Sequence, residues 1–252
     1  MKTPQGAGSE QQRLRADFAV YALAHLGDDL LVRLLDLFAG ERVVVSAIRE
    51  RKGHGLLALA DTNRIAVDIE QAHALEQLAA GGADAILLRE KDLSVPEYAA
   101  LAKQCLAICQ AYHTPLWLNS FREIAGALQL PVQLPMPILR TLTESQRAQL
   151  PAIGASVHSP EEAVLAEKLG ASWLIAGHIF ATACKPDLPP RGLDFLRNVC
   201  SSVSIPVYAI GGITPERLPA ITQAGAAGCC VMSQMMQCPD VSAEFQNWRK
   251  RI

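Results

Sequence analysis

Short apolar runs alternate with longer amphipathic stretches along most of the chain from Gly55 onward. The runs have the length of buried strands, and the stretches between most of them have the 3.6-residue period of helices. Strands are predicted over 56–60, 85–88, 115–118, 132–134, 153–157, 173–176, 207–210 and 228–232. Helices are predicted over 66–80, 96–112, 122–128, 160–169, 193–200, 215–223 and 241–251. Strands that alternate with helices in this way predict an α/β fold, a (β/α)8 TIM barrel of parallel strands.

A doubly wound open sheet is the alternative architecture. It is disfavoured because no G-x-G-x-x-G follows the first predicted strand. The link 136–151 is less regular than the others. Residues 1–53 are expected to form a mainly helical N-terminal extension of unknown role, and residues 54–252 the barrel domain. The extension could cover a barrel end, form an oligomer contact or be a remnant of another domain.

Composition narrows the class of partner. Half of the 252 residues are hydrophobic, the formal net charge is −2 and the pI is near 6.3, so no electrostatic case exists for nucleic acid or an anionic membrane. No apolar run reaches 18 residues and no signal peptide is recognised. We expect a cytoplasmic protein with a small-molecule partner; whether it is a homo-oligomer stays open. The seven cysteines are odd in number and form no C-x-x-C pair, which favours reduced thiols over disulfides or a metal framework.

The seventh predicted strand ends in a glycine pair, Gly211 and Gly212, followed by Thr214 and Pro215. Thr214 is a candidate helix cap, with Pro215 at the first helical position. A buried strand, bare backbone and a helix N-terminus together favour binding of an anion. An ordinary glycine turn explains the pair alone equally well. In TIM barrels, however, the loops after the last two strands frequently hold phosphate, and the eighth strand leads to Ser233.

Polar residues gather at the predicted carboxyl ends of the strands, where barrel enzymes carry their sites. They are Asp61, Asn63, Arg89, Lys91, Asn119, Gln133, His158, Gly177, His178, Gly211 and Ser233. His158 and His178 stand out from the other histidines because of this placement. For His158 a hydrogen-bonded structural role is as plausible as a functional one. Arg89 and Lys91 are candidates for neutralising substrate anions, or are ordinary surface charges.

Residues 55–238 contain a series of motifs in a characteristic order. The pieces are Leu88-Arg-Glu-Lys91, Ser156-Val-His-Ser-Pro-Glu-Glu-Ala163, Gly177-His-Ile-Phe180 with Thr182 and Lys185, Ala209-Ile-Gly-Gly-Ile213, and Val231-Met-Ser233. On these pieces the chain resembles the thiamine phosphate synthase/TenI superfamily. The resemblance implies a (β/α)8 barrel that acts in thiamine biosynthesis on a thiazole carrying an ethyl phosphate.

The superfamily contains a magnesium-dependent synthase, which joins a pyrimidine diphosphate to the thiazole phosphate, and a metal-independent thiazole tautomerase. This chain departs from the synthase pattern at four places. Leu87 stands where the synthase pattern has a glutamine, and His178 stands where it has a proline. Ser120 and Ile138 stand where aspartates are expected. These departures imply the tautomerase, an isomerase that aromatises a thiazole carboxylate phosphate without metal or cofactor.

The tautomerase resemblance also implies a role for each site residue. His178 would be the catalytic acid and base, because histidine titrates near neutral pH. Substrate binding would fall to Arg89, Lys91, Asn119, Gln133, His158 and Lys185, and phosphate binding to Gly211, Gly212, Met232 and Ser233. Two alternatives remain open: thiamine phosphate synthase, and a non-catalytic barrel that binds a thiazole phosphate.

Overall fold

The computed structural model describes residues 55–61, 69–90, 92–232, 235, 238 and 240–251. The predicted extension over residues 1–53 lies outside these ranges, so its helices are not tested. The site candidates Asn63, Lys91 and Ser233 also lie outside the described residues. No helix in the described part of the chain is both long enough and apolar enough to span a membrane.

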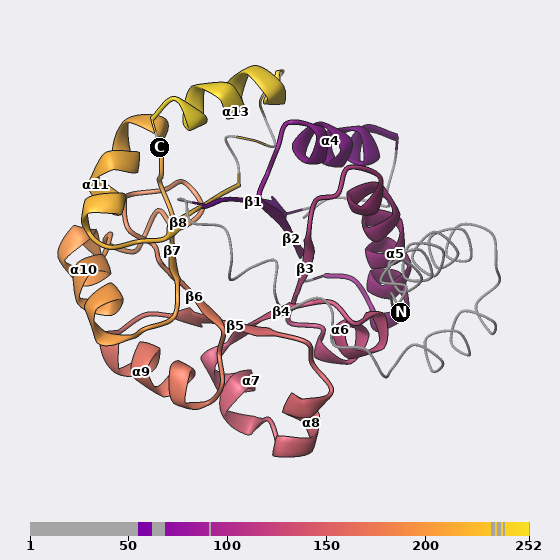
Figure 1. Cartoon of the computed structure of the whole chain (residues 1–252), viewed down its shortest axis with the longest axis horizontal. Helices are drawn as coiled ribbons and strands as arrows, with labels where there is room; N and C mark the ends of the chain where they lie inside the picture. Colours follow the sequence, from indigo (N-terminus) through magenta and orange to yellow (C-terminus); the bar gives the residue numbers. More distant parts are fainter. Residues whose placement is uncertain are drawn as a thin grey trace, which may run out of the picture. The chain divides into compact units, whose positions relative to one another are not determined.

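The parallel strands close into a ring in the order of the sequence (Figure 1). The strands are β1 (Gly55–Asp61), β2 (Ala85–Arg89), β3 (Leu116–Asn119), β4 (Val132–Pro135), β5 (Ile153–Val157), β6 (Trp173–Gly177), β7 (Val207–Ile210) and β8 (Gly228–Val231). β1 pairs in parallel with both β2 and β8, which closes the barrel. The predicted parallel α/β fold is confirmed, and the open doubly wound sheet is wrong because it would leave two free edges.

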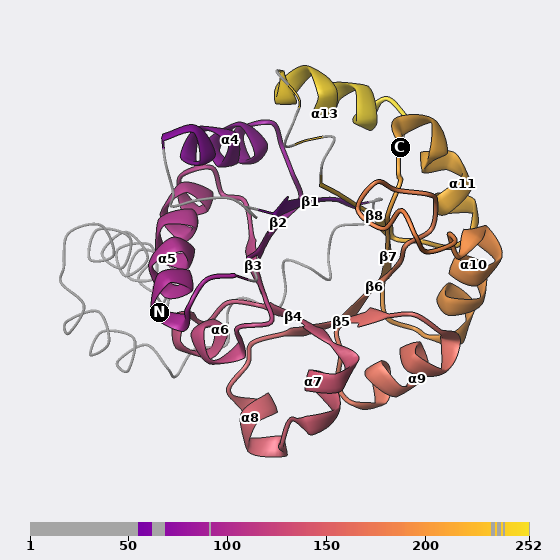
Figure 2. The same cartoon turned by 180° about the vertical axis from the view of Figure 1, so that it is seen from behind.

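Helices lie outside the strands around the ring, as the reverse view also shows (Figure 2). They are α4 (Ile69–Ala80), α5 (Val95–Ala111), α6 (Arg122–Leu128), α7 (Met136–Thr141), α8 (Glu144–Ala148), α9 (Pro160–Lys168), α10 (Gly192–Ser202), the 3₁₀ turn η1 (Pro215–Arg217), α11 (Leu218–Gln223) and α13 (Val241–Arg249). The short helices α7 and α8 occupy the link that looked irregular in sequence. Each has six residues or fewer, too short for a helical period to show.

Two apolar layers hold the barrel together, one on each side of the strands. The outer layer packs the strands against the helices and includes Leu88, Leu118 and Val157. The inner layer fills the barrel and includes Trp117 and Trp173, whose ring centroids lie 4.3 Å apart. Successive side chains along each strand point alternately into and out of the barrel, and so they supply the two layers in turn. The barrel interior is therefore a packed core, and a ligand can enter only at an end.

Tyr98 of α5 ties two strand ends together beneath the mouth of the barrel. Its buried hydroxyl donates to the carbonyl of Leu88 at 2.9 Å and accepts from the backbone N–H of Asn119 at 3.2 Å. Burial raises the pKa of Tyr98, so the hydroxyl keeps its proton near neutral pH. The ring stacks on Phe121 with centroids 3.8 Å apart. Tyr98 thus fixes where β2 and β3 present their last residues.

Replacing Tyr98 with Phe should lower the free energy of unfolding by about 1–3 kcal/mol, because a buried carbonyl and a partly buried N–H lose their shared partner. Urea denaturation measures the change as a lower midpoint with an unchanged slope. Tyr112→Phe is the matched control, since Tyr112 is 44% exposed. Equal midpoints for the two variants would show that the hydroxyl contributes nothing.

Candidate functional site

A pocket of about 730 Å³ opens at the carboxyl ends of the strands. Its described lining comprises Leu87, Arg89, Asn119, Gln133, Ser156, His158, Ile175, Gly177, His178, Ala181, Thr182, Cys184, Lys185, Ile210, Gly211, Gly212, Ile213, Thr214, Arg217, Cys230, Val231 and Met232. Most of the predicted site residues that fall in the described part of the chain are therefore brought to one cavity. The side chain of Asp61 is not among those described, although its backbone ends β1 beside Arg89.

The glycine pair after β7 packs directly against the segment after β6. Gly211 has φ +97°, and a Cβ there would lie 2.3 Å from the Cβ of His178. Gly212 has φ +64°, and a Cβ there would lie 2.4 Å from the carbonyl oxygen of Ala181. Only glycine fits both the left-handed backbone and this close approach. The pair is thus more than a turn: it lets bare backbone line the pocket.

The helix N-terminus expected after the glycines is not what forms there. Pro215–Arg217 is a 3₁₀ turn, and α11 begins only at Leu218 and has six residues. Thr214 sits at the cap position, but its side chain makes no capping hydrogen bond. A helix this short contributes little macrodipole. Anion binding at this end of the pocket must instead rest on the glycine backbone and on nearby cations.

Arg217 is such a cation, and the sequence reasoning missed it. Its guanidinium donates to the carbonyl of Gly212 and lies over the ring of Phe180, 4.4 Å from the ring centroid. These contacts hold the charge beside the glycine pair on the pocket wall. A signal was available, because a basic residue in the first turn of a helix opposes the helix dipole and calls for another explanation.

Two further cations line the cavity. Arg89 ends β2, and Lys185 lies on the segment after β6, where its backbone N–H donates to the carbonyl of Thr182 at 3.1 Å. No carboxylate appears among the described lining residues. The described mouth is therefore cationic, which suits an anionic ligand.

The two histidines singled out in the sequence both line the pocket, and both are anchored. His178 is buried, and its Nε2 lies 3.2 Å from the carbonyl oxygen of Leu188. His158 is exposed, and its Nδ1 lies 2.9 Å from the carbonyl oxygen of Gly177. A carbonyl only accepts, so His178 carries a proton on Nε2 and His158 on Nδ1. The structural hydrogen bond that the sequence allowed as an alternative role for His158 is thus present. Through its contact with Leu188, His178 anchors the segment that also carries Lys185.

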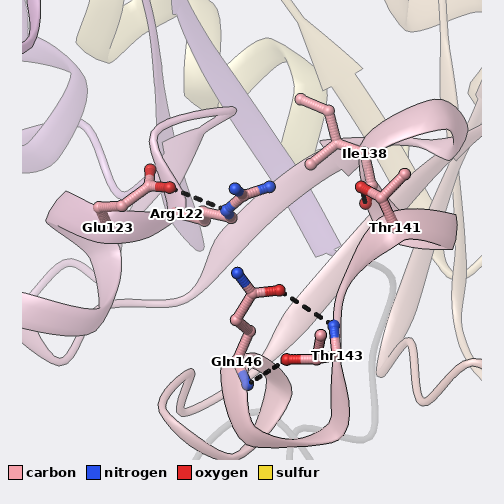
Figure 3. A network of polar contacts seen from close by, with 6 residues as sticks. All are labelled: Arg122, Glu123, Ile138, Thr141, Thr143 and Gln146. Carbon is pink, nitrogen blue, oxygen red and sulfur yellow. Dashed lines mark hydrogen bonds and ion pairs between the residues drawn. The ribbon is translucent and has the colours of Figure 1, made fainter.

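At the two positions where the synthase pattern has aspartates, after β3 and after β4, this chain has Ser120 and Ile138. Ser120 follows Asn119 and donates to its Oδ1 at 3.1 Å. After β4 the chain enters α7 at once, which places Ile138 on a helix (Figure 3). The polar contacts drawn there include the Arg122–Glu123 pair and the Thr143–Gln146 capping box of α8, and neither Glu123 nor Gln146 lines the barrel pocket.

The described residues of the pocket do not fit a magnesium ion. Mg²⁺ is held through carboxylate oxygens together with water and substrate phosphates. The described lining offers amides, hydroxyls and histidines but no carboxylate. Within the described part of the chain, no three His, Cys, Asp or Glu side chains come together in a way that could hold a metal.

The seven cysteines are free thiols in the structure, and they differ in accessibility. Burial raises the pKa of Cys105, Cys109 and Cys229 to about 12, whereas Cys184 is exposed at the pocket mouth. At pH 8 a thiol with a pKa near 12 is only ~0.01% thiolate, the reactive form.

We therefore expect iodoacetamide at pH 8 to modify Cys184 first in the folded protein. Peptide mass spectrometry identifies the modified residue, and Cys184→Ser should remove the fast phase. Rapid modification of Cys105 or Cys109 before Cys184 would mean that the barrel opens readily.

Fold and site together define a parallel α/β barrel of the class that carries its site at the carboxyl ends of its strands. The family model described as "Thiamine monophosphate synthase" (TMP-TENI) matches residues 56–235. The chain belongs to this family.

Named relatives are similar over most of their length. "Thiamine-phosphate synthase 2" of Streptococcus pneumoniae is 31% identical over 198 residues, covering 76% of this chain and 92% of the relative. "Thiamine-phosphate synthase" of Pyrococcus abyssi is 34% identical over 188 residues, covering 72% and 88%. Among solved structures, "Thiamine phosphate pyrophosphorylase" from Pyrococcus furiosus has 32% identity and a TM-score of 0.67, covering 79% of this chain and 95% of that one.

The prediction of a thiazole tautomerase, and with it of an isomerase, is wrong. The relatives at 31–34% identity carry the name of the synthase, and the similar solved structure is titled a thiamine phosphate pyrophosphorylase. Four single-residue departures from the synthase pattern do not outweigh this similarity. Of the four departures, Leu87 and His178 line the pocket, whereas Ser120 and Ile138 are not among its described lining residues. The proton-transfer role given to His178 belonged to the tautomerase and falls with it.

Proposed function

We propose that the protein is a thiamine-phosphate synthase, a transferase that joins a pyrimidine diphosphate to a thiazole phosphate and releases diphosphate. The observation that carries the proposal is the similarity to relatives of this name along 72–76% of the chain. The family model matches residues 56–235, a range that includes the described pocket lining from Leu87 to Met232. The pocket supports it, because it combines a cationic rim with an apolar interior.

The two ends of the pocket suit the two parts of such substrates. On one side Gly211, Gly212 and Arg217 offer bare backbone and a guanidinium to a phosphate group. Toward the barrel interior Leu87, Ile175 and Ile210 offer apolar surface to ring faces. Arg89 and Lys185 offer positive charge where negative charge would collect on a departing diphosphate. The finer assignment of the fold, a TIM-barrel domain over residues 54–252 behind a separate extension, is part of this proposal.

The test is direct coupling of the two substrates by the full chain. Purified protein incubated with the pyrimidine diphosphate and the thiazole phosphate should form thiamine phosphate and diphosphate in equal amounts. The assay is run across a range of Mg²⁺ concentrations, because the described lining holds no carboxylate. Failure to form thiamine phosphate at any Mg²⁺ concentration would contradict the proposal.

A non-catalytic thiazole phosphate-binding barrel is the second candidate, and the absence of carboxylates from the described lining is the observation that favours it. Calorimetry distinguishes the two functions. Binding of thiamine phosphate without any coupling of the substrates would select the binding barrel.

Replacing Arg217 with Ala should weaken binding of thiamine phosphate ~10–100-fold, the range expected when one hydrogen bond to a charged group is lost. Calorimetric titration measures the change. Arg197→Ala is the control, because Arg197 is an exposed arginine of α10 that pairs with Asp194 outside the pocket. Equal affinities for the two variants would remove Arg217 from the binding site.

A further inference from the structure

Gln133 is a buried polar residue on the floor of the pocket. It lies in β4, is 1% exposed and lines the cavity together with Ser156 of the neighbouring strand. A buried amide can turn by 180° and so present either an acceptor or a donor to a ligand. Which group it presents decides what the floor recognises.

A tryptophan beneath the floor removes this ambiguity. The indole Nε1 of Trp173 lies 2.8 Å from Oε1 of Gln133, and Trp173 is fully buried in the barrel interior. An indole N–H only donates, so the amide atom that faces it must be the oxygen. The nitrogen then faces the other way, where Nε2 donates to Oγ of Ser156 at 3.0 Å.

Gly154 of β5 makes this contact possible. A Cβ on Gly154 would lie 2.1 Å from Cε2 of Trp173 and 2.2 Å from Oε1 of Gln133. The missing side chain leaves the space in which the indole and the amide meet. A glycine inside a strand often marks such a close approach.

We propose that Trp173 is a positioning residue that holds Gln133 as a hydrogen-bond donor toward the substrate. An amide has two N–H bonds, and one of them is used on Ser156, so the second is left for a ligand in the pocket. The oxygen accepts a hydrogen bond from Trp173, which fixes the orientation of the amide. The floor therefore recognises an acceptor.

The surroundings of Gln133 identify the class of acceptor. Leu87, Ile175 and Ile210 line the same cavity and offer apolar surface, whereas the glycine pair and Arg217 lie on the wall formed by the segment after β7. A donor among apolar side chains suits a ring nitrogen of a heteroaromatic group better than a phosphate oxygen. This step rests on the proposed function, which supplies substrates with such rings.

The chain contains a matched control for Trp173. Trp117 packs against Trp173 at a tilt and is equally part of the inner core, and its buried Nε1 has no hydrogen-bond partner among the residues that the structure describes. Trp173→Phe and Trp117→Phe thus remove the same group from neighbouring positions. Only the first change releases the amide of Gln133.

The first readout needs no ligand. The side-chain amide of Gln133 is followed by ¹H–¹⁵N spectroscopy on the full chain and assigned by its absence in Gln133→Met. Trp173→Phe should shift this signal and speed its exchange with water at least ~5-fold, as expected when a net hydrogen bond of typical strength is lost. Trp117→Phe should leave it unchanged. Equal effects of the two variants would overturn the positioning role.

The second readout is the affinity for thiamine phosphate by calorimetry. Trp173→Phe should weaken binding ~5–20-fold, Trp117→Phe less than ~2-fold, and Trp173→Phe should add nothing in the Gln133→Met background. Gln133→Met keeps the length of the side chain and carries the test if Trp173→Phe does not fold. Wild-type affinity in Gln133→Met would overturn recognition by this residue. Failure of the wild type to bind thiamine phosphate would instead contradict the proposed function. The spectroscopic readout would still decide the role of Trp173.

Discussion

The variant Gly211→Ala should lose at least ~100-fold in affinity for thiamine phosphate and about 2–4 kcal/mol in the free energy of unfolding. Two costs combine at this position. Alanine is strained at φ +97°, and its Cβ would lie 2.3 Å from the Cβ of His178, which is far inside van der Waals contact. The segment after β6 must move away to accept the methyl group. That movement displaces the backbone that lines the pocket beside Arg217.

Gly170→Ala separates the two costs. Gly170 has φ +86°, but nothing lies within 4 Å of a Cβ placed there, and it does not line the pocket. We expect Gly170→Ala to lose about 1–2 kcal/mol of stability from the backbone strain alone and to bind thiamine phosphate as the wild type does. Calorimetry and urea denaturation on both variants measure the difference. If Gly211→Ala binds as tightly as Gly170→Ala, the glycine pair does not shape the binding site.

The variant Gly154→Ala should lower the free energy of unfolding by about 3 kcal/mol, the sum of overpacking and a broken buried hydrogen bond. The added methyl group would overlap both Trp173 and Gln133, and both are buried inside the barrel. Neither can swing into solvent. For a domain of this size we expect the melting temperature to fall by roughly 6–12 °C.

Gly126→Ala is the matched control for this second prediction. Gly126 lies within α6, and the nearest atom to a Cβ there is 3.5 Å away, an ordinary contact. Alanine in a helix interior is favoured over glycine by about 0.5–1 kcal/mol, so this variant should be unchanged or slightly more stable. The melting temperature should therefore fall in Gly154→Ala and stay the same or rise slightly in Gly126→Ala. A stable, cooperatively folded Gly154→Ala protein would show that the interior has room to repack.

The site was predicted in outline because strand ends can be read from the hydrophobic pattern. In a parallel barrel every carboxyl end lies at the same face, so Arg89, Asn119, Gln133, His158 and His178 converge once their strands are placed. Such reasoning needs no side-chain contacts. It fails where a residue reaches the site from a turn or from beneath the floor, as Arg217 and Trp173 do.

The choice of activity went wrong for a related reason. Ser120 and Ile138 stand where the synthase pattern has aspartates, and their identity alone does not decide the reaction. Single positions at loops and short helices vary more readily than the elements they connect. Similarity along 72–76% of the chain to named synthases outweighs them.

The sequence by itself determined the parallel α/β fold, the family and most of the pocket wall, because period, strand length and motif order are local properties of the chain. Tertiary structure decided how those residues are held. Trp173 and Gln133 are 40 residues apart, and their hydrogen bond exists only because β4, β5 and β6 lie side by side with a glycine between the two side chains. Likewise, Gly211 must be glycine because of His178, a neighbour that only the closing of β6 against β7 supplies. Contacts between distant segments depend on packing, and no local pattern encodes them.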